Sequence, residues 1–250
     1  MDLFVFLPCY NEELNITELI QAWNDQKDAL SDLGYSLIIY AIDDCSIDST
    51  KQKITDMTSA YENVNLIEHT ENKGLCGGLN TAIAHFLEFG NDNSLMVLMD
   101  GDNTHNPKYI FDMISKVDKF DCIIASRYCK NSNTVGVAAH RTLLSDLARF
   151  YYKFLLRVPN VEDYTCGYRV YSYCIIKKMV ENFGVDPIKE KSFACMMELL
   201  YKCYLSGATF DEIGFELRYD YKKGESKIAL MNTIRNSLIT ALKLSRQRKV

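Results

Sequence analysis

Two aspartates one residue apart, Asp100 and Asp102, directly follow an apolar run at 96–99. Carboxylates at this spacing on a tight turn can both reach one divalent cation, and Gly101 between them permits the close approach of a ligand or of another backbone segment. Mg²⁺ usually takes one or two protein carboxylates and fills its other positions with water and substrate phosphates. The pair therefore suits a metal–diphosphate complex, and the alternative is an Asp-Gly turn that holds no ligand.

Polar clusters also follow two earlier apolar runs. Residues 8–13 read PCYNEE, and residues 43–50 read DDCSIDST. In open α/β sheets ligands bind beyond the carboxyl ends of the strands, so we expect these clusters and 100–105 to converge on one crevice. Helix capping, for example by Asp48, is the competing explanation for a single cluster.

The elements that must position these clusters alternate along the first half of the chain. Strands are expected at 3–8, 35–44, 63–69, 94–100 and 121–126, and helices at 16–33, 49–61, 79–90 and 107–117. The second half predicts helices at 137–157, 173–182, 190–206 and 227–248, and strands at 167–172 and 208–217. Strands this apolar, separated by helices, indicate an α/β fold with a mostly parallel sheet covered on both faces. We expect one domain at 1–225 and a C-terminal basic amphipathic helix at 226–250.

Composition narrows the function classes. The chain has 250 residues, of which 48% are hydrophobic, and its net charge is −5, which permits a full core and disfavours nonspecific nucleic-acid binding. Its nine cysteines are scattered without a CxxC pair, which is typical of a reduced, cytoplasmic protein. The N-terminal sequence does not read as a signal peptide, and no apolar run is long enough to span a bilayer. Membrane contact, if it occurs, is expected to be peripheral.

The glycine-rich segment 72–82, NKGLCGGLNTA, lacks the GxxxxGK[ST] pattern of a P-loop. No kinase base motif is present either. One candidate that remains is a reaction in which a nucleoside diphosphate is the leaving group and a metal neutralises its charge.

Seven motifs occur in order across 8–227: PCYNEE, DDCSIDST, NKGLCGG, DGDNTHNP, ASRY, DYTCGYR and KKGESK. This series resembles the family 2 glycosyltransferases, which have the GT-A fold. Within that family the GESK motif and the spacing of the later arginines and serine resemble the dolichol-phosphate mannose synthase group, which makes polyprenyl-phosphate sugars. The chain differs from the group's pattern at Tyr221, where an arginine is common, and at Cys166.

The resemblance implies roles for particular residues. A nucleotide would be held by Pro8, Tyr10, Glu12, Asp43, Asp44 and Asp100, with Asp44 supporting its loop. Mg²⁺ or Mn²⁺ would be bound by Asp100 and Asp102, with Thr104 as a third ligand, directly or through water. Asp102, Arg127, Arg141 and Lys227 would act in catalysis, and Arg141, Ser145, Asp163 and Arg169 would serve the acceptor or its phosphate.

The resemblance further implies inverting transfer of a sugar from a GDP- or UDP-linked donor to a polyprenyl phosphate at the cytoplasmic face of a membrane. A phosphate acceptor is already anionic and needs no base, whereas a hydroxyl acceptor needs one. The sequence contains no decisive base candidate. Two alternatives stay open: a soluble transferase that glycosylates a hydroxyl in polysaccharide or glycolipid synthesis, and a noncatalytic subunit that binds nucleotide sugars.

Three other features allow two interpretations each. Glu198, in an apolar helical stretch, could form a structural ion pair or belong to the active site. The basic tail 226–250 and the aromatic helix 143–156 could pack on the domain, or they could lie on an anionic membrane beside the path of the lipid acceptor.

Overall fold

The structure is a computed structural model that describes residues 1–136, 139–220, 223 and 230–247, without the side chains of 139–143 and 230–234. Its main sheet is built from β1 (Asp2–Cys9), β2 (Ser36–Asp43), β3 (Val64–Glu68), β4 (Leu95–Leu98), β5 (Cys122–Ser126), β7 (Arg169–Ser172) and β8 (Phe210–Gly214). The strand order is β3-β2-β1-β4-β7-β5-β8, and β7 alone of these seven runs antiparallel to its neighbours. The short strands β6 (Asn133–Val135) and β9 (Glu216–Arg218) form a separate parallel pair. The mostly parallel sheet confirms the predicted fold class.

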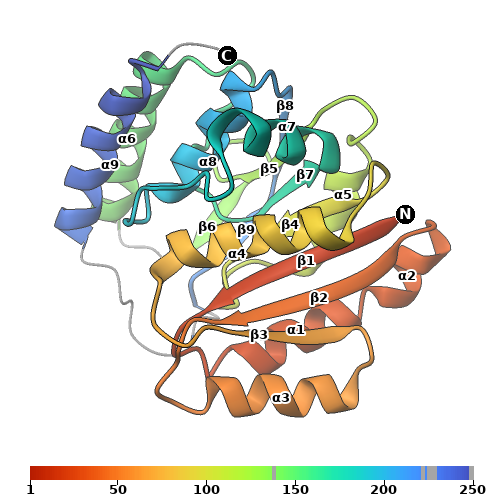
Figure 1. Cartoon of the computed structure of the whole chain (residues 1–250). Coiled ribbons are helices and arrows are strands. Elements are labelled where there is room, and N and C mark those ends of the chain that lie inside the picture. The colour runs from red at the N-terminus through yellow and green to blue at the C-terminus, as the bar shows by residue number, and fades with distance from the viewer. Residues whose placement is uncertain (137–138, 221–222, 224–229, 248–250) are drawn as a thin grey trace.

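Helices cover both faces of this sheet. They are α1 (Ile16–Asn24), α2 (Lys27–Asp32), α3 (Thr50–Ala60), α4 (Gly74–Phe89), the 3₁₀ turn η1 (Pro107–Tyr109), α5 (Ile110–Ile114), α6 (Ala139–Leu156), α7 (Tyr173–Phe183), α8 (Cys195–Leu205) and α9 (Leu230–Leu244). In Figure 1, α4 and α7 cross in front of the sheet and α1 lies behind β1 to β3. Because both faces are covered, β1 and β4 are apolar along nearly their whole length, which is the pattern that the sequence displayed.

The structure differs from the expected elements in several places. The helix expected at 16–33 is two helices, α1 and α2, and the strand expected at 208–217 is divided into β8 and β9. Helix α4 begins at Gly74, so the glycine-rich segment is helical. A Cβ atom at Gly78 would lie 3.0 Å from Cβ of Pro8, so glycine at this position allows α4 to approach the end of β1 closely.

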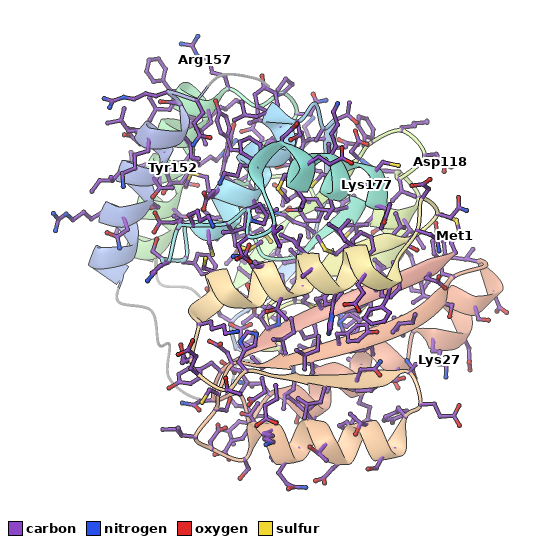
Figure 2. The ribbon with its side chains drawn as sticks, in the orientation of Figure 1. Met1, Lys27, Asp118, Tyr152, Arg157 and Lys177 are labelled. Carbon is purple, nitrogen blue, oxygen red and sulfur yellow. The ribbon has the colours of Figure 1, made fainter. Side chains whose placement is uncertain are left out.

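Helices α6 and α9 lie side by side at one edge of the molecule (Figure 1). The hydroxyl groups of Tyr152, which Figure 2 labels on α6, and Ser237 are 2.7 Å apart, and they join the two helices. On the outer surface of α6, Leu147, Phe150 and Phe154 are more than half exposed. Within the described ranges, no helix is both long and apolar enough to cross a membrane.

Candidate active site

The turns after β1, β2 and β4 meet at one edge of the sheet, as predicted, because these strands are parallel neighbours. Each turn contains a residue in the left-handed region, with φ of 54° at Asn11, 60° at Cys45 and 59° at Asn103. A cavity of about 270 Å³ opens there. It is lined by Pro8, Tyr10, Glu12, Asp100, Gly101, Asp102, Thr104, His105, Arg127, Thr165, Cys166, Gly167, Phe193, Leu217 and Tyr219.

Two glycines make space around the aspartate pair. A Cβ atom on Gly101 would lie 3.0 Å from the carbonyl oxygen of Pro8, so the turn can pass over the end of β1 only with glycine at that position. A Cβ atom on Gly167 would lie 2.5 Å from Oδ1 of Asp100. The described residues contain no cluster of three or more His, Cys, Asp or Glu side chains suited to a metal. Two carboxylates in an open cavity fit a cation that takes its remaining ligands from substrate phosphates and water.

A hydrogen-bonded chain of side chains orients Asp102. The Thr104 hydroxyl donates to Oδ1 of Asp102 at 2.7 Å, and the amide of Thr104 donates to the same oxygen. Since that hydroxyl has one hydrogen, Nδ1 of His105, 3.1 Å from it, must be the donor in their contact, and Nε2 then accepts from the Cys166 thiol at 3.5 Å. The Thr104 hydroxyl therefore supports Asp102, which argues for an indirect contribution to a metal site.

His105 is the site residue that sequence reasoning missed. Its ring is stacked 5.2 Å from Phe215, and burial lowers the pKa of His105 to about 4, so the imidazole is neutral near pH 7. Burial raises the pKa of the Cys166 thiol, which keeps the proton that it donates. The position of His105, three residues after Asp102, was the one signal in the sequence that could have identified it. That position alone does not determine whether the side chain faces Asp102.

Arg127 forms one wall of the cavity and is held from behind by Asp163. Nε and Nη2 of Arg127 each donate to an Asp163 carboxylate oxygen at 2.7 Å, and Nη2 also donates to the Thr165 hydroxyl. Burial alone would raise the pKa of Asp163, but the Arg127 guanidinium outweighs it and lowers that pKa to about 2. Nη1 makes no hydrogen bond within the described ranges. Asp163, expected on the acceptor side, is fully buried and positions Arg127.

The carboxylates at the end of β2 have different environments. Asp43 is buried and does not line the cavity, and its Oδ1 has no hydrogen-bond partner within the described part of the chain. Asp44 accepts from the backbone amides of Lys73 and Gly74, each at 2.8 Å, and from Nδ1 of His69 at 2.6 Å. These bonds join Asp44 to the start of α4, and its predicted support of a nucleotide-binding loop stays a prediction.

Comparison with known proteins shows which family has this sequence. Residues 4–181 match the family model described as Glycosyl transferase family 2. The chain belongs to this family. It is 30% identical to the dolichol-phosphate mannosyltransferase of Pyrococcus furiosus over 230 residues, which cover 91% of the chain and 59% of that protein. It is 24% identical to the undecaprenyl-phosphate mannosyltransferase of Micrococcus luteus, covering 92% and 88% of the two chains.

Solved structures support the same fold for this family 2 chain. Glucosyl-3-phosphoglycerate synthase from Mycobacterium tuberculosis, in complex with Mg²⁺ and UDP, aligns with a TM-score of 0.62 and 16% identity over 97% of this chain and 79% of that one. The fold is therefore GT-A, as the motifs predicted. The chain spans about three-fifths of the length of the Pyrococcus relative.

Some of the residues that were predicted to belong to the site do not line the cavity. Arg169 is fully buried in β7, where its guanidinium donates to the carbonyl oxygens of Met196 and Tyr164, so direct contact with an acceptor phosphate does not fit its placement. Ser145 lies on α6, 2.7 Å from the hydroxyl of Tyr128. The side chain of Arg141, residue Lys227 and the departure at Tyr221 lie outside the described residues.

Glu198 forms a structural ion pair, which was one of the two interpretations that the sequence allowed. It forms an ion pair with Lys202 at 2.6 Å, and its other oxygen accepts from the amides of Lys189 and Glu190. It does not line the cavity.

Proposed function

We propose that the chain is an inverting glycosyltransferase that moves a sugar from a nucleotide sugar to a polyprenyl phosphate, with Mg²⁺ or Mn²⁺ as cofactor. The observation that carries the proposal is that Asp100, Asp102 and Arg127 share one cavity at the carboxyl ends of the strands. The names of the two relatives support the same reaction, since both are polyprenyl-phosphate mannosyltransferases.

The residues of the cavity have separable tasks in this reaction. Tyr10 and Glu12 would bind the nucleotide, and Asp100 and Asp102 would hold the metal. The bound metal supplies positive charge where the diphosphate accumulates negative charge. Arg127 would donate to a phosphate oxygen, and its attachment to Asp163 fixes it before substrate arrives, which lowers the cost of ordering it.

The environment of His105 favours a phosphate acceptor over a hydroxyl acceptor. A hydroxyl nucleophile needs a base within hydrogen-bond reach. His105 is neutral, but both of its ring nitrogens are occupied by Thr104 and Cys166, so it does not offer a free base. The carboxylates that line the cavity, Glu12, Asp100 and Asp102, are those assigned to the nucleotide and the metal. An anionic phosphate can attack without such help.

We further propose that the protein associates peripherally with the cytoplasmic face of a membrane through α6 and α9. Phe150 and Phe154 are 63% and 68% exposed on α6, and Ile239 and Leu242 are 42% and 41% exposed on α9. Exposed aromatic and aliphatic side chains on adjacent helices are typical of an interfacial surface.

A transfer assay with separated acceptors tests the proposal. The first step is a thermal-shift panel of GDP-mannose, UDP-glucose and UDP-N-acetylglucosamine with Mn²⁺, because the correct donor stabilises the folded state in proportion to its occupancy. GDP-mannose is the first candidate, since both relatives are mannosyltransferases. The stabilising donor is then incubated with either a polyprenyl phosphate or a hydroxyl acceptor. Transfer to the lipid phosphate supports the proposal; transfer only to a hydroxyl, or no metal-dependent donor binding at all, contradicts it.

A further inference from the structure

A second cavity, of about 410 Å³, lies between α4 and the segment 186–191. Three lysines line it: Lys73 at the start of α4, and Lys189 and Lys191 on the opposite side. Asp186 is the one acidic residue among its lining side chains. No ion pair joins any of the three lysines to another described residue, so three lysines against one aspartate give the lining residues a net positive charge.

The backbone that carries Lys189 is held in place by buried side chains. Asn80 of α4 pairs with both backbone groups of Ile188, at 3.0 and 2.9 Å. Nζ of Lys202 donates to the carbonyl oxygen of Pro187 at 2.5 Å. Glu198 accepts from the amide of Lys189 at 2.9 Å. Five backbone groups of residues 187–190 are bonded to side chains of α4 and α8, so the backbone that carries Lys189 is preorganised and need not be ordered when a ligand binds.

The opposite side of the groove is fixed as well. The amide of Lys73 donates to Asp44, which anchors the residue to the end of β2. A Cβ atom on Gly77 would lie 2.1 Å from Cβ of Lys73, so the glycine lets the lysine lie against the first turn of α4. The ammonium groups of the groove therefore project from two anchored segments that face each other across the cavity.

The groove borders the proposed membrane surface. Oε2 of Glu190 accepts from the hydroxyl of Thr240 at 2.6 Å, which joins the segment to α9. The exposed Ile239 and Leu242 lie on the same helix. Figure 1 shows the segment between α7 and α8 passing between the start of α4 and α9.

We propose that this groove binds a phosphate group, and that its ligand is the phosphate of an anionic lipid headgroup when α6 and α9 rest on a bilayer. Lysine ammonium groups suit phosphate as point charges, and basic side chains near an anionic surface each contribute about 1 kcal/mol. The claim that the ligand is a lipid headgroup rests on the proposed membrane association. The claim that the groove binds a phosphate group does not.

The test measures binding of the full chain to phosphatidylcholine vesicles with and without phosphatidylglycerol, and separately the thermal shift with inorganic phosphate. The variant is Lys189→Gln/Lys191→Gln. We expect its affinity for the anionic vesicles to fall roughly 30-fold, at about 1 kcal/mol for each lysine. The control Lys177→Gln/Lys178→Gln changes net charge equally on α7, where Figure 2 labels Lys177, and should bind as the unmodified chain does.

The outcomes separate the sources. Loss of vesicle binding in the variant supports a lipid headgroup as the ligand. Loss of the inorganic phosphate shift with unchanged vesicle binding supports a phosphate site in the groove but contradicts the lipid source. Equal losses in the two double variants, or no loss in either assay, overturn the phosphate site. The donor thermal shift with Mn²⁺ is measured in parallel, because its absence would contradict the proposed transferase while leaving the result for the groove intact.

Discussion

Asp100 and Gly167 come from segments far apart in the sequence and fit together only because residue 167 has no side chain. A Cβ atom there would lie 2.5 Å from Oδ1 and 2.6 Å from Oδ2 of Asp100. The segment that precedes β7 thus limits where the Asp100 carboxylate can lie.

We expect Gly167→Ala to displace the Asp100 carboxylate and to weaken metal-dependent nucleotide binding at least tenfold, since ligand positions must be held within a fraction of an ångström. Isothermal titration with the donor nucleotide and Mn²⁺ measures this effect. Asp100→Asn is the reference for full loss of the ligand. If Gly167→Ala binds as tightly as the unmodified protein, the close contact does not constrain the site.

Asp102→Asn should lower the transfer rate by roughly 10²–10³, by analogy with the loss of a preorganised charge. Removing the metal with EDTA should have an effect at least as large. The matched control is Asp118→Asn, an exposed aspartate before β5 that Figure 2 labels on the side of the molecule opposite α6 and α9. The assignment is wrong if Asp102→Asn and Asp118→Asn have the same rate.

Asp163 should make the protein sensitive to acid below pH 4. Its pKa falls from 3.8 to about 2 in the folded state, so its contribution is complete above about pH 4 and is lost as the pH falls towards 2. The shift corresponds to about 2 kcal/mol of unfolding free energy. Asp163→Asn, which leaves Arg127 without its carboxylate, should cost about 3 kcal/mol at neutral pH. Urea unfolding across this pH range measures both, and a variant as stable as the parent would contradict the pairing.

His105 should dominate a second acid transition at higher pH. Burial lowers its pKa from 6.5 to about 4, so the unfolded chain takes up a proton that the folded chain refuses, and stability falls as the pH drops from 6.5 to 4. The expected loss is about 3 kcal/mol. His105→Gln should flatten this part of the curve of unfolding free energy against pH. His85→Gln, at a half-buried histidine whose pKa burial also lowers, should flatten the curve less, and an unchanged slope in His105→Gln would refute the assignment.

Phe150→Ser/Phe154→Ser should weaken binding to phospholipid vesicles. Each ring that enters the bilayer interface contributes about 1.5 kcal/mol, so the pair should account for roughly 100-fold in affinity. Flotation with vesicles measures the bound fraction. Phe89→Ser removes a ring that is 53% exposed at the end of α4 and should have no effect. Unchanged flotation of the double variant would rule out α6 as the contact surface.

The sequence alone determined the fold class and the convergence of the three strand-end clusters. Apolar runs separated by helices specify a covered, mostly parallel sheet, and parallel strands place their carboxyl ends on one edge. The motif order predicted the GT-A fold of family 2, and the Asp100–Asp102 pair could be identified as a candidate metal site because it depends only on local spacing.

Tertiary structure alone decided which distant groups meet. The roles of Asp163 behind Arg127, of His105 behind Asp102, and of Glu198 beneath the lysine groove depend on contacts between segments that no local period connects. Arg169 shows the same limit, because its motif predicted a place near the acceptor and packing buried it in β7. A local sequence pattern specifies whether a segment forms a strand, a helix or a turn. Whether a given side chain faces the cavity or the core depends on how the strands and helices pack.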